Sequence, residues 1–65
     1  MIKAVIKKLS LEHVVELYQD EHYFATIYAD KVEASIGSHT GKPFLVIDNL
    51  KATIHPDEVE DERAK

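Results

Sequence analysis

The chain has 65 residues, with 12 acidic and 8 basic side chains, a formal net charge of −4 and no cysteine. This length allows one domain, the missing cysteines exclude disulfides and thiolate metal sites, and the acidic balance argues against duplex DNA as the main partner. No apolar run reaches the roughly 18 residues of a membrane span, and the lysine-rich start is too short for a secretory signal, so we expect a cytoplasmic protein.

Residues 1–9 predict a first strand, because every second position, Ile2, Ala4 and Ile6, is apolar. Residues 11–19 fit two structures. Ser10 is a good N-cap for a helix, whereas the neighbouring valines and Tyr18 favour a strand. We favour the strand, because a loop at residues 20–22 then extends one apolar face, with Leu17 opposite Ala25 and Val15 opposite Ile27.

Residues 23–29 and 32–37 alternate strictly between apolar and more polar positions. Folding the chain at Asp30-Lys31 matches the two alternations, which predicts an antiparallel hairpin. Its first face carries small aliphatic residues, namely Ala25, Ile27, Ala29, Val32, Ala34 and Ile36. Its second face carries Phe24, Thr26 and Tyr28 against Glu33, Ser35 and Gly37.

The rest of the chain predicts short elements. Residues 37–43 hold both glycines and a proline and indicate a loop. Residues 44–47 are continuously apolar, as in a buried strand, and residues 50–54 alternate again. We therefore predict an all-β fold, a small antiparallel sheet or barrel of five to six strands, with or without a short C-terminal helix. The alternative is an α+β fold in which residues 11–19 are helical.

The predicted domain covers residues 1–55. Residues 56–65 would form an acidic tail or a short helix, because Pro56 followed by two acids suits a helix start and only Val59 could anchor the segment.

The sequence offers no set of residues for catalysis, a cofactor or a metal ion. Its four histidines lie nine, seventeen and sixteen residues apart, which matches no local metal-ligand spacing. The loop GSHTGKP has three residues between its glycines and a proline after its lysine, so it is not a phosphate-binding loop. The serines lack a nucleophile motif. We therefore expect a protein that is not an enzyme, and we assign no catalytic, cofactor or metal residue.

One face of the predicted sheet carries aromatic side chains where a solvent-facing surface should be polar. We take four residues of this face as candidate partner-binding residues, namely Val14, Tyr18, Phe24 and Tyr28. Two other arrangements stay open: the sheet curls so that other segments cover the rings, or the rings form the core and the alanine-rich face lies outside.

The expected function is a protein-interaction module, a homo-oligomer or a binder of another protein that uses the aromatic sheet face. The alternative is a small barrel that binds single-stranded nucleic acid by stacking bases on Phe24 and Tyr28. The acidic net charge counts against nucleic acid, and we expect no membrane partner.

Overall fold

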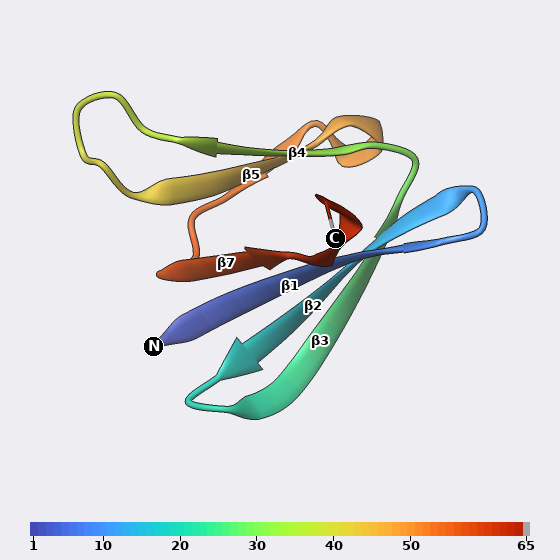
Figure 1. Ribbon diagram of the computed structural model, residues 1–65, viewed down its shortest axis with the longest axis horizontal. Helices are drawn as coiled ribbons and strands as arrows, with labels where there is room; N and C mark the ends of the chain where they lie inside the picture. The colour runs from blue at the N-terminus through green and yellow to red at the C-terminus, as the bar shows by residue number, and fades with distance from the viewer. Residues whose placement is uncertain (65) are drawn as a thin grey trace.

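The computed structural model describes residues 1–64, and in that range the chain forms seven strands in two sheets (Figure 1). The strands are β1 (Ile2–Leu9), β2 (Glu12–Gln19), β3 (His22–Ala29), β4 (Val32–Ile36), β5 (Pro43–Ile47), β6 (Ala52–Ile54) and β7 (Glu58–Asp61). Two single 3₁₀ turns, η1 (Asp48–Leu50) and η2 (Glu62–Ala64), follow β5 and β7. Sheet A has the order β3-β2-β1-β7, and sheet B has the order β4-β5-β6.

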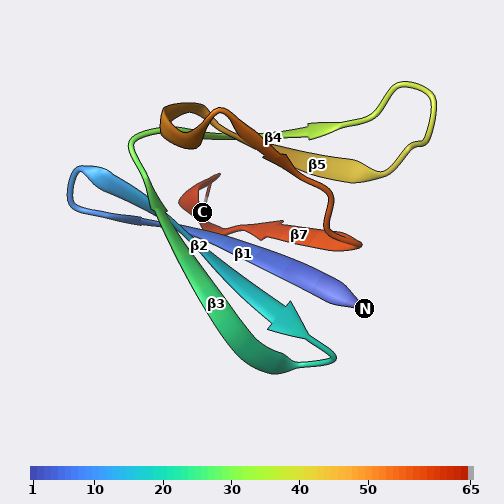
Figure 2. The same ribbon diagram turned by 180° about the vertical axis from the view of Figure 1, so that it is seen from behind.

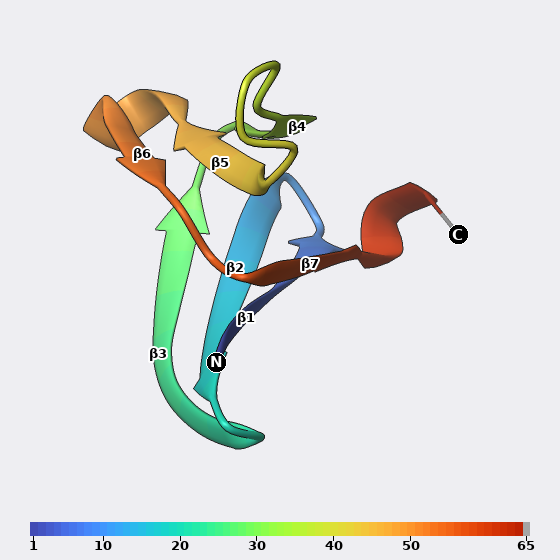
Figure 3. The ribbon, with the colours of Figure 1, turned by 90° about the vertical axis from the view of Figure 1, so that its left-hand side faces the viewer.

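Sheet B lies over one face of sheet A, and the aliphatic side chains between them form the core (Figures 2 and 3). The buried cluster draws on both sheets and consists of Ala4, Ile6, Val15, Ala29, Val32, Leu45 and Ile47. On β1, β2 and β3 these are the alternate positions that the sequence assigns to an aliphatic face. The aliphatic side of sheet A therefore faces the core, and its aromatic side faces outward.

Two tight hairpins join the first three strands of sheet A. In the second hairpin the two turn residues, Asp20 and Glu21, have φ angles of 48° and 73°. Two positive φ values are characteristic of the type I′ turn, whose twist matches that of the strands it joins. The register pairs Val15 with Ile27 and Leu17 with Ala25, as expected from the sequence. Residues 11–19 thus belong to a strand, and the helical alternative is wrong.

The hairpin predicted at Asp30-Lys31 is wrong. β3 pairs with β2 and β4 pairs with β5, so the chain crosses from sheet A to sheet B at this point. Ala29 and Val32, on either side of the crossing, are each 3% exposed and enter the core from opposite sheets. The turn η1 holds the crossing in place, since the Asp48 amide donates to the Lys31 carbonyl.

This crossing also changes the environment of the second predicted strand. Ala34 and Ile36 were expected on a buried aliphatic face, but both are exposed on β4, and Ile36 is 63% exposed. Only the first residue of β4 reaches the core. The alternation therefore predicts the facing of β3 correctly from Phe24 onward, and that of β4 incorrectly.

The C-terminal segment is part of the sheet. Residues 56–65 were expected to form an acidic tail or a short helix, but β7 pairs in parallel with β1 and η2 is a single turn. Asp57 aligns the two strands: its amide donates to the Ile2 carbonyl at 2.8 Å, and its carboxylate accepts from the Ile2 amide at 2.7 Å. Val59 packs against the core. Lys65 lies outside the described residues.

The predicted all-β class is confirmed. The described residues contain seven strands where five to six were expected, and one of the pairings in sheet A is parallel. The short segment at residues 44–47 is part of β5, which lies in the middle of sheet B. Residues 37–42 form the loop between β4 and β5.

Candidate interaction surface

The outer face of sheet A carries a group of rings that we call the aromatic face, made of Tyr18 on β2 and Tyr23, Phe24 and Tyr28 on β3. Tyr23, Phe24 and Tyr28 are 57%, 53% and 61% exposed. Alternation along the strands directs this face away from sheet B, because the intervening residues pack on the core. Of the three arrangements considered from the sequence, the structure has the aliphatic side inside and the rings outside.

Tyr23 is a member of this face that sequence reasoning missed. Strict alternation would put it on the side of Ala25, toward the core. A register shift between Leu17 and Tyr18 leaves one extra residue on β3, so that Tyr23 stands opposite Tyr18. The two rings meet edge to face, with centroids 5.9 Å apart and planes at 66°. A bulge of this kind leaves no clear signal in one sequence.

Tyr18 is the half-buried member of the aromatic face. Its hydroxyl donates to the Glu16 carboxylate at 3.3 Å, and the side chain of Tyr23 bonds to that of Thr26. Partial desolvation, together with the charge of Glu16, raises the pKa of Tyr18 above its ordinary value. The shift follows from the Glu16 carboxylate beside the phenol, to which the protonated hydroxyl donates.

Val14 lies beneath this surface and not on it. It stands opposite Tyr28 in the β2–β3 register and is only 4% exposed. Other side chains of the chain already cover it, so it offers almost no surface to a partner. Glu33 and Ser35, which were expected beside the rings, lie on β4 in sheet B. The aromatic face consequently belongs to β2 and β3 alone.

An open groove of about 760 Å³ adjoins the aromatic face over β1, β2 and β7. We call it the acidic groove, because six carboxylates line it, namely Glu16, Asp20, Glu21, Glu58, Glu60 and Glu62. Lys3 pairs with Glu60 at 3.2 Å and Lys7 with Glu16 at 3.0 Å. These partners, mainly through their hydrogen bonds, raise the pKa of both lysines. Sequence reasoning missed this groove because it did not place β7 beside β1.

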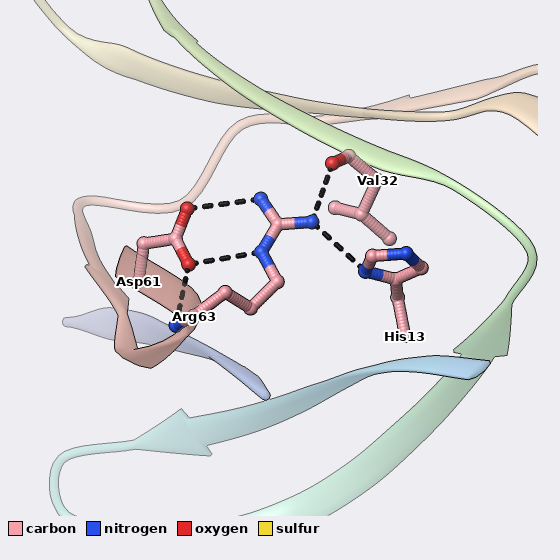
Figure 4. A network of polar contacts seen from close by, with 4 residues as sticks. All are labelled: His13, Val32, Asp61 and Arg63. Carbon is pink, nitrogen blue, oxygen red and sulfur yellow. Dashed lines mark hydrogen bonds and ion pairs between the residues drawn. The ribbon is translucent and has the colours of Figure 1, made fainter. Parts of the chain in front are cut away.

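Arg63 in η2 ties the end of the chain to both sheets (Figure 4). Its guanidinium donates two hydrogen bonds of 2.9 Å to the Asp61 carboxylate and one of 2.7 Å to the Val32 carbonyl. It also lies 3.1 Å from Nδ1 of His13. Hydrogen bonds from Arg63 lower the pKa of Asp61, and Asp61 in turn raises the pKa of Arg63. The cluster thus joins β2 and β7 of sheet A to β4 of sheet B.

The loop between β4 and β5 is also engaged in its own hydrogen bonds. The Gly37 amide donates to the Lys42 carbonyl, and the Gly41 amide donates back to the Gly37 carbonyl. Gly41 has a φ of 69°, which suits glycine in this turn. The Gly41 amide is therefore not free to hold an anion, as a phosphate-binding loop would require.

The described part of the chain holds neither a metal cluster nor a membrane-spanning helix. No three histidine, aspartate or glutamate side chains in residues 1–64 gather closely enough to hold a metal ion. Nor does any helix within those residues have the length and apolar character needed to cross a membrane. Comparison with family models, with curated proteins and with solved structures finds no match for this chain.

Proposed function

We propose that this chain is a protein-interaction module without catalytic activity, which docks through the aromatic face onto a second copy of itself or onto another protein. The observation that carries the proposal is the exposure of Tyr23, Phe24 and Tyr28, each more than half exposed on one strand. Single exposed apolar residues are ordinary on soluble proteins, but a contiguous group with tyrosines is typical of interfaces.

The energetics also support docking. Fully burying one exposed aromatic side chain contributes on the order of 1.5–3 kcal/mol, and a ring that is 53–61% exposed gains roughly half of that, so the three rings together supply part of the free energy of a micromolar complex. The rings are also partly ordered before binding. Tyr18 and Tyr23 contact each other, and the Tyr23 hydroxyl bonds to Thr26, which reduces the entropy lost when a partner immobilises them.

Single-stranded nucleic acid remains a second candidate because exposed rings on a strand can stack on bases. The charges around the rings count against it. Lys3, Lys7 and Lys31 each form an ion pair with a glutamate of this chain. The groove beside the rings is acidic, whereas a phosphate backbone requires basic side chains. A salt titration with a fluorescent oligonucleotide tests this candidate, and binding at low salt would favour it over protein docking.

Sedimentation velocity from micromolar to millimolar concentration tests the docking proposal. We expect the natural protein to self-associate and the double variant Phe24→Ser/Tyr28→Ser to remain monomeric. Leu50→Ser is the matched control, because Leu50 is 57% exposed on η1 in the other half of the molecule. It should associate like the natural protein. A natural protein that stays monomeric over the whole range, or a double variant that associates equally well, would contradict self-docking by this face.

A further inference from the structure

We propose that the free edge of β3 pairs in antiparallel orientation with β3 of a second copy, around a two-fold axis at Thr26, so that two copies of sheet A join into one continuous sheet. This inference rests on the self-association in the proposed function: it takes a second copy as the partner and adds a contact along the edge of β3, where Phe24 of one copy and Tyr28 of the other stand side by side.

β3 is an edge strand of sheet A, and just beyond its last residue the Asp30 amide donates to the Asn49 side chain of η1. It pairs with β2 on one side, and no strand of the described residues pairs with its other side. Every second residue of such a strand directs its amide and carbonyl away from the sheet, where a further strand can bond to them. β3 has eight residues, and its stretch from Tyr23 to Ala29 contains no charged side chain and no proline. These are properties of a strand that accepts a neighbour.

The other sheet edges carry features that discourage pairing. β7 is a four-residue strand with acidic side chains at Glu58, Glu60 and Asp61. β6 has three residues and is soon followed by Pro56. On β4 the Val32 carbonyl already accepts a hydrogen bond from the Arg63 guanidinium. Short length, charge and occupied backbone groups are the usual protections of edge strands. Within residues 1–64, β3 is the long edge without charge or proline.

The residues of β3 are complementary to themselves in the antiparallel register centred on Thr26. Thr26 then stands opposite Thr26 of the second copy, and Phe24 stands opposite Tyr28 on the outer face. On the inner face Ala25 stands opposite Ile27. Threonine pairs and aromatic pairs directly across two antiparallel strands are favourable contacts. The two halves of the interface are identical, as a closed two-fold dimer requires.

The side chains at the ends of this register can also bond to each other. His22 of one copy comes to lie near Asp30 of the other, and both are exposed. A shift by one residue would set the aromatic outer face of one strand beside the aliphatic inner face of the other. The bulge near Tyr23 lies where β3 curves at its start (Figure 3). Thr26, at which the proposed two-fold axis passes, lies beyond this bulge.

Disulfide crosslinking of single-cysteine variants tests the register, because the natural chain has no cysteine. Residues directly opposite on antiparallel strands have Cα atoms about 4.5–5.5 Å apart, within the range of a disulfide. We expect Thr26→Cys to form a covalent dimer under mild oxidation at least about tenfold faster than Thr53→Cys, the control at an exposed position of β6. Phe24→Cys and Tyr28→Cys should crosslink to each other when mixed, and more slowly when alone.

A charge exchange at the same position gives a second measurement. In Thr26→Lys two positive charges face each other across the axis, and in Thr26→Glu two negative charges do. The dissociation constant of the dimer should therefore rise at least about fivefold in each variant. A mixture of the two should recover dimerisation as a heterodimer. Sedimentation velocity measures all three samples.

The possible outcomes separate this inference from the proposed function. If the natural protein associates and the Phe24/Tyr28 double variant does not, but Thr26→Cys crosslinks no faster than Thr53→Cys, the edge pairing is overturned and docking by the aromatic face stands. If the Lys and Glu variants do not recover on mixing, the register at Thr26 is overturned. A natural protein that remains monomeric overturns both the pairing and self-docking.

Discussion

The turn between β2 and β3 offers a stabilising substitution. Glu21 has a φ of 73°, a region in which a side chain costs about 1–2 kcal/mol and in which glycine is unstrained. Glycine also costs about 0.5–1 kcal/mol through the greater freedom of the unfolded chain. We therefore expect Glu21→Gly to raise the free energy of unfolding by about 0.5–1 kcal/mol. For a domain of this size that raises Tm by about 2–8 °C. The substitution gives up the weak attraction between Glu21 and Lys3.

Two further variants make this prediction specific. Glu12→Gly changes the same residue type at an exposed position in β2, where glycine should lower stability by about 0.5–1 kcal/mol. Asp20→Gly relieves the neighbouring turn position but removes the ion pair with the Met1 amino group, so it should gain less than Glu21→Gly. Thermal and urea unfolding followed by circular dichroism measure all three. If Glu21→Gly is no more stable than the natural protein, or if Glu12→Gly stabilises equally, the strain argument is refuted.

Three other predictions concern the core and the C-terminal cluster. Arg63→Met removes the donors to Asp61 and to the Val32 carbonyl, and should lower the free energy of unfolding by about 1–3 kcal/mol; an unchanged urea midpoint would contradict this. Arg63 lowers the pKa of Asp61, so in acid the Asp61 carboxyl binds a proton less readily in the folded chain than in the unfolded chain. The stabilisation from this pair is therefore complete above the ordinary carboxyl pKa, and it is lost as the pH falls through the lowered pKa of Asp61 in the folded chain. In Asp61→Asn the free energy of unfolding should fall less steeply as the pH is lowered than it does in the natural protein. The same pH dependence in both proteins would contradict the role given to Asp61. Leu45→Ala, at a fully buried position, should cost about 2–5 kcal/mol in urea unfolding, and a smaller loss would show that the two sheets repack around the site.

Part of the surface proposed for docking was predictable from sequence and part was not. The alternation in β3 places Phe24 and Tyr28 on one side and Ala25 and Ile27 on the other, and the structure has them so. The apolar residues of β2 and β3 also select one register, but the structure reaches it with a two-residue turn at Asp20 and Glu21 followed by a bulge, where a loop at residues 20–22 was expected. Tyr23 was missed because a single bulged residue reverses the facing of all residues before it.

The amino-acid sequence alone determined which segments of residues 1–54 form strands. For β1, β2 and β3 it also determined which face of the strand is apolar, because alternation is a local property of the chain. Which strands become neighbours was decided by the tertiary structure. Ala29 and Val32 are both buried, but they enter the core from opposite sheets because the chain crosses from sheet A to sheet B between them, whereas a hairpin would have buried them side by side. β7 joins β1 because Asp57 and Val59 find partners there that are distant in sequence. Strand pairing depends on these long-range contacts, and an alternation that fits a hairpin fits a crossing between two sheets equally well.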